Sequence, residues 1–497
     1  MKGRSWKGLS AAQGDEARAF LARLGTEDTQ VCGAHEAWRI RIEKSVFTFY
    51  DKGTLYFNGG EGQLLEHAVQ EISRLLGQTR DPTTKEYLIG LDETGKGEVL
   101  GHAVLAVAVV QRDALDRLEA AVGTADTKKA HAFAFWDQLY RELDGLRGRG
   151  LTWELQTLPP WDVDRYNLNL ILDVVYQRLL SRVLLSLDPP ACRITLDDYG
   201  IGKNLRGYLD ALSKQGAEIR VEAKSDEKYV EARTASVLAK WRRQQAMQGI
   251  ARDFSFTDAP VGSGNAGDSE TLVWLRRWKE TAKPWPWFVK TSFKTVRELD
   301  GKEGKAPKAV PPIRHELLSV DAQERFAEGQ LSTASLSLVC PACGATLTAA
   351  KLTPDPARGL LGRCLNCDKV IPDLDTTLRY YSGVAVLDAS VIIAGSISKD
   401  LDRLGFFDGF ALLLHPVVAA ETDTEGGRSE LAKLGTHAAK GRVDWHALKG
   451  SSIPAKDRHD EAIIETAKDL NAILVTKDGG MYGLAVARGM FCLTFRA

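Results

Sequence analysis

The sequence predicts a multidomain α/β protein, and three features lead to this fold class. The chain has 497 residues, which at roughly 150 residues per domain is enough for about three domains. Apolar segments with the periodicity of strands and of helices alternate along most of the chain, as is typical of α/β folds. Four of the seven cysteines fall in two close pairs, which predicts a metal-binding unit between larger domains.

The composition is that of a globular protein. Hydrophobic residues make up 44% and charged residues 26%, which argues against wholesale disorder and against a fibrous repeat. The formal net charge is −1, so a nucleic-acid site would need local basic surface. The N-terminus lacks the apolar segment of a signal peptide, and the longest apolar run, 99–110, is too short to cross a bilayer. We therefore expect a cytoplasmic protein with no membrane partner, and the sequence names no protein partner.

The first predicted domain covers residues 1–83. Residues 36–59 alternate apolar and polar side chains around the turn Asp51-Lys52-Gly53, which predicts a β-hairpin. Residues 63–76 have helical spacing. The pattern indicates a small α+β domain.

A longer domain is expected over residues 84–298. Its first strand, YLIGLD, runs into a glycine-rich turn and a second apolar strand, after which helices and strands alternate to about Val296. Acids follow three of the predicted strands, and these acids are Asp92, Glu93, Asp197 and Asp226.

Acids that meet at strand ends provide oxygen ligands for divalent cations. Two such ions about 4 Å apart can activate water and stabilise a departing phosphate oxygen. Because adjacent side chains point to opposite faces of a strand, we expect a bulge or a metal ion to reconcile Asp92 with Glu93. Any one acid alone is more often a solvated strand end or a helix cap, but four together favour a metal site.

Five segments of this domain resemble, in order, the motifs of type 2 ribonucleases H. They are GLDETGKG (90–97), TADTKKA (124–130), ITLDDYG (194–200), KSDEKYVEARTASVLAK (224–240) and GSGNAGDSETLVWL (262–275). The resemblance implies a ribonuclease H-like mixed sheet with helices, and cleavage of the RNA strand of RNA/DNA hybrids with two Mg²⁺ or Mn²⁺ ions. It also implies that the four acids named above are the catalytic metal ligands.

The tripeptide Gly95-Lys96-Gly97 resembles the family's GRG sequence, whose backbone amides read ribose 2′-hydroxyls. Glycine lets the main chain approach a sugar closely, and the 2′-hydroxyl distinguishes RNA from DNA. Lys96 keeps the charge of the usual arginine but lacks its planar fork. Lys128, in the second motif, is also assigned to substrate binding.

The resemblance is closest to the HIII type. Ribonucleases HII and the eukaryotic enzyme have a junction-sensing tyrosine where this chain has Asn265. Ribonucleases HIII lack this tyrosine and carry an N-terminal domain similar to the TATA-binding protein, which residues 36–78 resemble. The first domain is therefore expected to dock the substrate.

Basic and aromatic residues concentrate in segments 240–245 and 274–293. Arginines can neutralise phosphates, so a hybrid-binding groove is predicted here, although a solvated basic face fits nearly as well. The arginines assigned to this groove are Arg242, Arg243, Arg276 and Arg277. Trp274 and Trp278, four residues apart, are expected to pack inward.

Residues 299–337 mix Gly, Pro and Lys without periodicity at their start and predict a linker. Residues 338–373 then predict a zinc ribbon with ligands Cys340, Cys343, Cys364 and Cys367, because two C-x₂-C pairs with twenty residues between them suit tetrahedral zinc. Four thiolates leave no open position, so the zinc would be structural. The alternatives are buried free thiols and iron–sulfur ligation. The isolated Cys32, Cys192 and Cys492 are expected to be buried.

The last predicted domain, 382–497, has a second set of acids at strand ends and at a helix start. Taken singly, Asp460 fits a helix N-cap and Asp478 a turn residue about as well as a functional role. Segments 387–393, 417–423 and 458–489 resemble the PIN nuclease domain, which implies a Mg²⁺- or Mn²⁺-dependent ribonuclease acting on single-stranded or structured RNA. The ligands implied are Asp388, Glu421, Asp460 and Asp478, with Thr476 in support.

The sequence thus predicts a ribonuclease H joined through a zinc ribbon to a PIN-type nuclease, with RNA/DNA hybrid and RNA as partners. Cleavage would leave 5′-phosphate and 3′-hydroxyl ends. Two rival functions fit the same patterns. In one, a centre is inactive and the chain is a nucleic-acid-binding scaffold. In the other, the PIN domain is the main enzyme and the hybrid-binding domain targets it.

Overall fold

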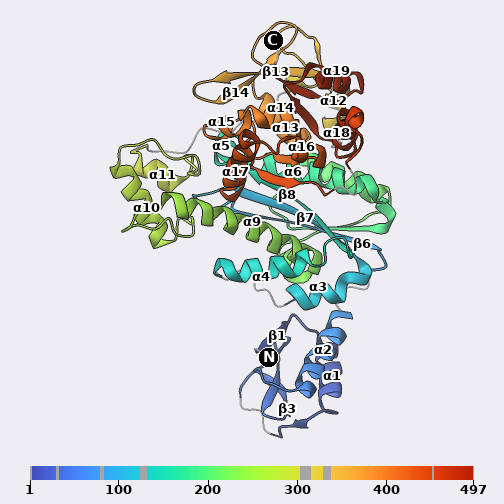
Figure 1. Ribbon diagram of the computed structural model, residues 1–497. Helices are drawn as coiled ribbons and strands as arrows, with labels where there is room; N and C mark the ends of the chain where they lie inside the picture. The colour runs from blue at the N-terminus through green and yellow to red at the C-terminus, as the bar shows by residue number, and fades with distance from the viewer. Residues whose placement is uncertain are drawn as a thin grey trace.

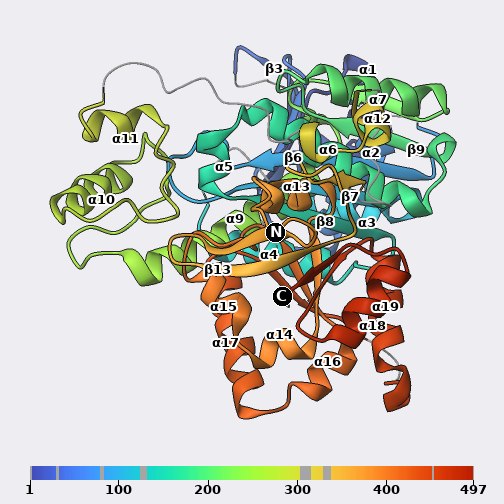
Figure 2. The same cartoon turned by 90° about the horizontal axis from the view of Figure 1, so that it is seen from above.

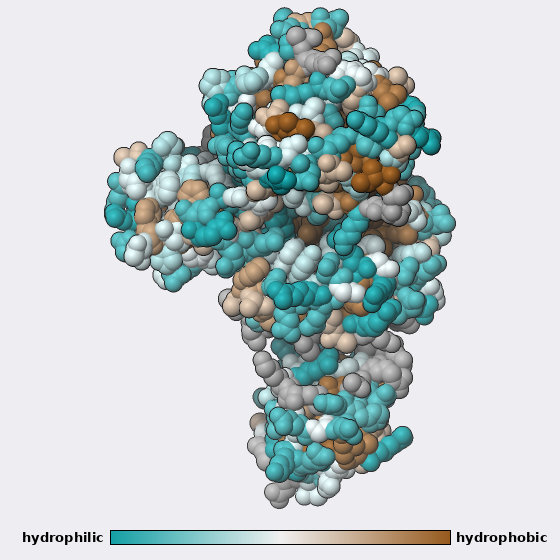
Figure 3. All heavy atoms as spheres, viewed as in Figure 1, coloured by the Kyte–Doolittle hydropathy of each residue, from teal (hydrophilic) through white to brown (hydrophobic). Residues whose placement is uncertain are grey.

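The computed structural model describes residues 3–29, 33–78, 83–123, 131–302, 315–327, 337–449 and 453–495. It shows a multidomain α/β protein with a small N-terminal domain below a larger body (Figure 1), which confirms the predicted fold class. No helix among these residues is long and apolar enough to span a membrane. On the face drawn in Figure 3 hydrophilic residues dominate, and the hydrophobic ones are scattered.

The N-terminal domain is an antiparallel sheet packed against two helices. The strand order is β1-β5-β4-β3-β2. Aromatic side chains, among them Phe47 and Phe57 with ring centroids 4.6 Å apart, fill the core beneath the helices. The elements are β1 (Arg4–Lys7), α1 (Ala11–Leu21), β2 (Thr26–Glu27), β3 (Glu36–Ile42), β4 (Ser45–Tyr50), β5 (Thr54–Phe57) and α2 (Gln63–Gln78).

The predicted hairpin in this domain is two consecutive hairpins. The turn at Asp51–Gly53 joins β4 to β5 as expected, but a second turn separates β3 from β4. Glu43 makes this second turn with a φ of 55°. No residue pattern indicated this turn, because glutamate is not typical of left-handed turn positions.

The central domain contains a mixed five-stranded sheet. Its order is β10-β9-β6-β7-β8, with β9 and β10 parallel to β6 and with β7 and β8 in antiparallel pairing. Its strands are β6 (Tyr87–Thr94), β7 (Ala103–Gln111), β8 (Leu151–Leu158), β9 (Cys192–Leu196) and β10 (Glu218–Val221). Its longer helices are α3 (Leu115–Val122), α4 (Phe133–Asp144), α6 (Leu168–Val183), α7 (Lys203–Lys214), α9 (Val230–Phe254) and α10 (Ser269–Glu280). The short ones are η1 (Arg112–Ala114), α5 (Pro160–Arg165), η2 (Leu184–Ser186), η3 (Pro189–Ala191), α8 (Ser225–Lys228) and α11 (Lys294–Leu299).

Helices cover both faces of this sheet. One face packs on α3, α4 and α9 through residues such as Leu88 and Val104, and the other packs on α6 and α7 through Ile89 and Leu105. In Figures 1 and 2, α10 and α11 project from the body, where they have a small aromatic core of their own.

The C-terminal domain is built on a seven-stranded sheet of order β14-β13-β19-β18-β15-β16-β17. Its strands are β13 (Ala349–Asp355), β14 (Gly359–Cys364), β15 (Val384–Leu387), β16 (Ala411–Leu414), β17 (Asp444–Ala447), β18 (Ile473–Thr476) and β19 (Cys492–Thr494). Its helices are α13 (Leu374–Tyr381), α14 (Ala389–Ile393), α15 (Ser396–Leu401), α16 (Pro416–Glu421), α17 (Glu425–Ala439), η5 (Lys456–Arg458), α18 (His459–Asp469) and α19 (Gly479–Ala487). A separate pair of short strands, β11 (Leu338–Val339) and β12 (Thr346–Leu347), precedes the sheet.

The hairpin that follows the first cysteine pair is part of this C-terminal sheet, because β13 lies parallel to β19. The segment predicted as a linker also has structure where it is described, namely η4 (His315–Leu317) and α12 (Val320–Ala327). Leu317 and Leu318 are buried in the common core. The sequence did not indicate that this segment packs on the core, because its apolar stretch is very short. Residues 303–314 and 328–336 lie outside the described part.

Buried ion pairs join the central and C-terminal domains. Arg379 on α13 pairs with Asp162 on α5, and both side chains are buried. Tyr380 donates its hydroxyl to the same carboxylate at 2.9 Å. On the other side, Arg242 of α9 pairs with Asp444 of β17 at 2.7 Å. Since a buried charge without a partner is costly, these pairs favour one relative arrangement of the two domains.

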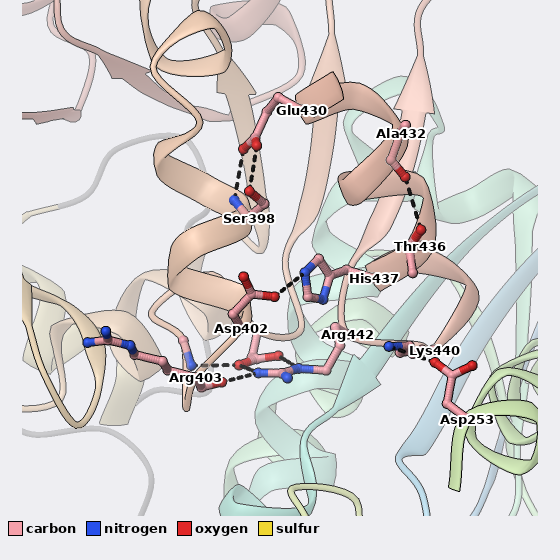
Figure 4. A network of polar contacts seen from close by, with 12 residues as sticks. Asp253, Ser398, Asp402, Arg403, Glu430, Ala432, Thr436, His437, Lys440 and Arg442 are labelled. Atoms are coloured by element: carbon pink, nitrogen blue, oxygen red, sulfur yellow. Dashed lines mark hydrogen bonds and ion pairs between the residues drawn. The ribbon is translucent and has the colours of Figure 1, made fainter. Parts of the chain in front are cut away.

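Helix α17 extends this junction, as Figure 4 shows. Lys440, which follows α17, points toward Asp253 of α9, with an Nζ to Oδ2 distance of 2.7 Å. Within the C-terminal domain, Glu430 accepts hydrogen bonds from the backbone N–H and the hydroxyl of Ser398, at 2.8 and 2.5 Å. This helix segment therefore connects α15 of the C-terminal domain to the long helix α9 of the central domain.

We predict that Gly90→Ala destabilises the central domain. Helix α9 crosses β6 so closely that a methyl group on Gly90 would lie 2.1 Å from the carbonyl carbon of Glu231. The overpacking should cost about 2 kcal/mol or more, which lowers the thermal midpoint of this domain by roughly 5 °C. Gly97→Ala is the matched control, because a methyl group there meets no heavy atom within 4 Å. Equal midpoints for the two variants in calorimetry would contradict this account of the packing.

Candidate metal centres and catalytic acids

The parallel pairing of β6 with β9 brings two of the predicted acids together. Leu91 lies opposite Leu196 in this ladder, and Asp92 and Asp197 are the next residue on each strand. Because neighbouring strands are about 4.8 Å apart, these two carboxylates start from adjacent positions at one edge of the sheet.

Asp226 joins this pair through a helix cap. Asp197 accepts hydrogen bonds from the backbone N–H groups of Lys224 and Ser225, at 2.5 and 3.4 Å. Lys224 has a φ of 60°, and this turn starts the short helix α8, which carries Asp226. Asp197 therefore fixes the segment that presents Asp226.

The electrostatics of Asp92 reflect this crowding of negative charge. Burial, followed by the charge of Glu93, raises the pKa of Asp92 to about 7, and the charge of Asp226 acts in the same direction. A hydrogen bond from Ser236 and the charge of Lys240, both on α9, act against this shift. Such a carboxylate cluster is the type of site that a divalent cation stabilises.

Glu93 lies on the opposite face of β6 from Asp92. The ladder with β7 is continuous, with Asp92 opposite Ala106 and Glu93 opposite Leu105. The expected bulge is therefore absent, because β6 continues beyond both acids to Thr94. Glu93 instead accepts a hydrogen bond from the Tyr176 hydroxyl at 2.6 Å and pairs with Lys96.

Divalent ions suit the all-oxygen donor set of Asp92, Glu93, Asp197 and Asp226. These oxygens are spread out, however. In the described part of the chain, only the four paired cysteines hold three or more ligand atoms within 4.8 Å of one another. Binding of an ion by the acids would therefore require side-chain movement.

The glycine-rich turn after β6 is hydrogen-bonded to Lys290, a buried residue that no sequence pattern singled out. Gly95 has a φ of 85°, and a Cβ there would lie 2.4 Å from the His102 carbonyl oxygen. Lys290 is fully buried and donates from Nζ to the carbonyl oxygens of Gly95 and, at 2.7 Å, of Glu98. Burial lowers the pKa of Lys290 to about 7. Lys290 lies in the aromatic and basic segment 274–293, but the pattern did not distinguish it from its basic neighbours.

Two of the four predicted groove arginines are structural. Arg242 and Arg243 are each 4% exposed; Arg242 pairs with Asp444, and Arg243 donates to the carbonyls of Leu100 and Ser263 at 3.3 and 3.2 Å. Their assignment to substrate binding is wrong, because the C-terminal domain and the loop before α10 cover them.

The other two arginines, Arg276 and Arg277, are exposed on α10. Arg277 pairs with Glu280 at 3.0 Å. Trp274 is fully buried and Trp278 is half-buried, so the expectation of inward packing is confirmed for Trp274 and met in part for Trp278. Lys128 and Cys32 lie outside the described residues.

The four paired cysteines form one cluster. The Sγ atoms of Cys340 and Cys367 are 3.7 Å apart, and those of Cys343 and Cys364 are 3.9 Å apart. Tetrahedral zinc with Zn–S bonds of about 2.3 Å requires S···S separations of about 3.8 Å, so the cluster fits zinc. A hydrogen bond from the Asn366 amide, followed by one from a backbone N–H, lowers the pKa of Cys343 to about 6 and favours the thiolate that a metal needs. Cys192 and Cys492 are buried, as expected.

The second set of acids gathers at the end of the C-terminal sheet. β15 and β18 are parallel neighbours with Leu387 opposite Val475, so Asp388 and the segment leading to Asp478 emerge at the same edge. Burial, followed by the charges of Asp388, Asp478 and Glu421, raises the pKa of Asp460. All four acids are thus within electrostatic reach of one another.

Individual contacts orient these acids. Thr476, the residue that the PIN resemblance placed in support of the acids, donates to Asp388 at 2.6 Å. Ser390 also hydrogen-bonds Asp388, and His459 contacts Glu421 at 2.8 Å; no sequence pattern indicated either contact. Asp460 lies in the first turn of α18 and is not its N-cap.

Asp478 does cap a helix. It accepts hydrogen bonds from Gly480 and Met481 at the start of α19, at 2.6 and 3.1 Å. The helix-capping role and the proposed metal role of Asp478 therefore use the same carboxylate.

Comparison with known proteins identifies the central domain. Residues 89–296 match the family model of ribonuclease HII, so this segment is a ribonuclease HII-family domain. The ribonuclease HII of Aeropyrum pernix is 29% identical over 214 residues, which are 43% of this chain and 90% of that protein.

Solved structures also align with the chain. The crystal structure of the ribonuclease H2 from Pyrococcus horikoshii OT3 has a TM-score of 0.37 at 24% identity, covering 43% of this chain and 97% of that chain. The crystal structure of Bst-RNase HIII in complex with Mn²⁺ has a TM-score of 0.35 at 18% identity, covering 60% of this chain and 98% of that chain.

We predict that the purified protein contains about one zinc ion per chain, measured by mass spectrometry of the metal. Cys364→Ser should lose most of this zinc, because three thiolates and a hydroxyl bind it more weakly. Cys192→Ser is the matched control, since Cys192 is buried and outside the cluster. Equal zinc content in both variants would refute the assignment.

Proposed function

We propose that this chain is an endoribonuclease that cuts the RNA strand of RNA/DNA hybrids at the centre formed by Asp92, Glu93, Asp197 and Asp226. The observation that supports the proposal is the placement of Asp92, Asp197 and Asp226 at neighbouring backbone positions in a ribonuclease HII-family domain. The named function of the relatives, ribonuclease HII, is in keeping with it. Products would have 5′-phosphate and 3′-hydroxyl ends.

Different residues of the site would have different roles in the reaction. Asp92, Glu93, Asp197 and Asp226 would hold Mg²⁺ or Mn²⁺, which would supply an acidified water and a positive charge at the leaving 3′-oxygen. Gly95 and Gly97 would present backbone amides to the ribose 2′-hydroxyl, and Gly97 borders open space. Lys290 keeps this turn in place from the protein interior.

The N-terminal domain would dock the hybrid, as the HIII-like arrangement implies. The face of its sheet away from the helices includes Tyr56, which is 42% exposed and lies opposite the exposed Ser5 on the neighbouring strand. Polar and aromatic side chains of this kind can contact a sugar–phosphate backbone. On the central domain, Arg276 and Arg277 are the two predicted groove arginines that are exposed, and they would contact the phosphates of the hybrid.

We further propose that the C-terminal acids form a second, PIN-type ribonuclease centre for single-stranded or structured RNA. The support is the mutual electrostatic influence of Asp388, Glu421, Asp460 and Asp478 at the edge of a parallel sheet. Two rival functions make different predictions. A scaffold with one inactive centre would keep only one of the two activities, and a PIN enzyme targeted by the hybrid-binding domain would cut RNA but not hybrid.

We predict that Asp92→Asn lowers hybrid cleavage by at least about 10³-fold, because loss of one metal-ligand charge removes stabilisation of the transition state. Hybrid binding should change little. The assay compares a hybrid, a duplex with one ribonucleotide and free RNA in Mg²⁺ or Mn²⁺. Asp198→Asn, a change at the exposed neighbour of Asp197, is the matched control and should keep its activity. Retained hybrid cleavage by Asp92→Asn would defeat the assignment.

We predict that Asp388→Asn removes cleavage of single-stranded RNA by a similar factor and leaves hybrid cleavage intact, since the two acid clusters lie in different sheets. Asp423→Asn is the control, because this carboxylate is exposed and pairs with Arg428. Unchanged digestion of single-stranded RNA by Asp388→Asn would count against a PIN centre.

A further inference from the structure

Lys96 places its ammonium group beside Glu93, a buried acid of the first centre. Its ammonium group pairs with Oε1 of Glu93, whose side chain is only 4% exposed. The other oxygen, Oε2, accepts the hydrogen bond from Tyr176 at 2.6 Å. Both oxygens of Glu93 therefore have partners within the protein.

The two partners of Glu93 differ in how firmly they are held. Tyr176 is buried on α6 and cannot leave without disturbing the core. Lys96 is 42% exposed and reaches Glu93 from the surface turn after β6. Its Nζ also lies 5.5 Å from the centre of the Tyr199 ring, a cation–π contact that is weak at exposed sites.

We propose that Lys96 is a built-in counter-ion for Glu93, which a divalent cation must displace. This inference rests on the proposed metal-dependent function. It identifies Lys96 as a positioning residue whose ammonium group lowers the affinity of the first centre for the metal.

Charge and geometry support the displacement. A divalent cation bound to Oε1 of Glu93 would meet the ammonium group at the same oxygen, and two cations there repel each other. The hydrogen bond from Tyr176 to Oε2 can persist, so Glu93 stays oriented while Oε1 changes partner. Once released, the flexible lysine side chain lies beside Gly97, where the backbone borders open space.

The test is a Mn²⁺ titration of the full chain, with free Mn²⁺ followed by electron paramagnetic resonance. All variants carry Asp388→Asn and Asp478→Asn to silence the second centre, and all are loaded with zinc beforehand. Binding at the first centre is defined as the part that is lost on adding Asp92→Asn. Lys96→Met removes the charge and keeps an aliphatic chain, and Lys96→Arg is the matched control that keeps the charge.

We expect Lys96→Met to bind Mn²⁺ roughly tenfold more tightly than the parent, as expected for removing a charge that competes for a carboxylate. Lys96→Arg should stay within about twofold, because it restores the competing cation. Unchanged or weaker binding by Lys96→Met, with Asp92-dependent binding present in the parent, would overturn the inference and leave the proposed function intact. Absence of Asp92-dependent binding in the parent would overturn both.

Discussion

Parallel pairing of β6 with β9 is the constraint on which the first centre depends. It aligns Leu91 with Leu196, and the residues that follow, Asp92 within β6 and Asp197 just after β9, therefore lie side by side. The cap that Asp197 gives to α8 then adds a third acid. The C-terminal domain uses the same principle, since β15 and β18 are parallel and end in acidic segments. In both domains, backbone pairing collects like charges that repel one another, and a divalent cation is the natural counter-ion.

The central and C-terminal domains act as one structural body because a continuous core and buried ion pairs join them. The hydrophobic core extends from the α6 face of the central sheet to the C-terminal sheet. Arg242 of α9 reaches into the C-terminal domain, and Arg243 beside it holds the loop before α10. The long helix α9, which covers one face of the central sheet, thus also contacts the C-terminal domain. The spacing between the two acid centres is therefore fixed by packed structure and not by a free linker.

Much of this architecture could be predicted from the sequence, because strand-end acids and paired cysteines are local patterns. Asp92, Asp197 and the four cysteines were all located by their place in such patterns. The failures concern contacts between distant segments. Arg242 was predicted to lie on the surface, because nothing in the sequence shows that the C-terminal domain covers it. Lys290 was missed because its partners are backbone carbonyls 195 and 192 residues away, and the docking of Leu317 and Leu318 was missed because their apolar stretch is very short.

Anomalous diffraction from crystals soaked in Mn²⁺ would show whether the four separated acids of the ribonuclease HII-family domain form a divalent-cation site. We expect manganese peaks bounded by Asp92, Glu93, Asp197 and Asp226, with the Lys96 ammonium moved away from Glu93. Manganese found only elsewhere in the chain, with these four carboxylates empty and Lys96 still paired with Glu93, would show that the acids do not form this site.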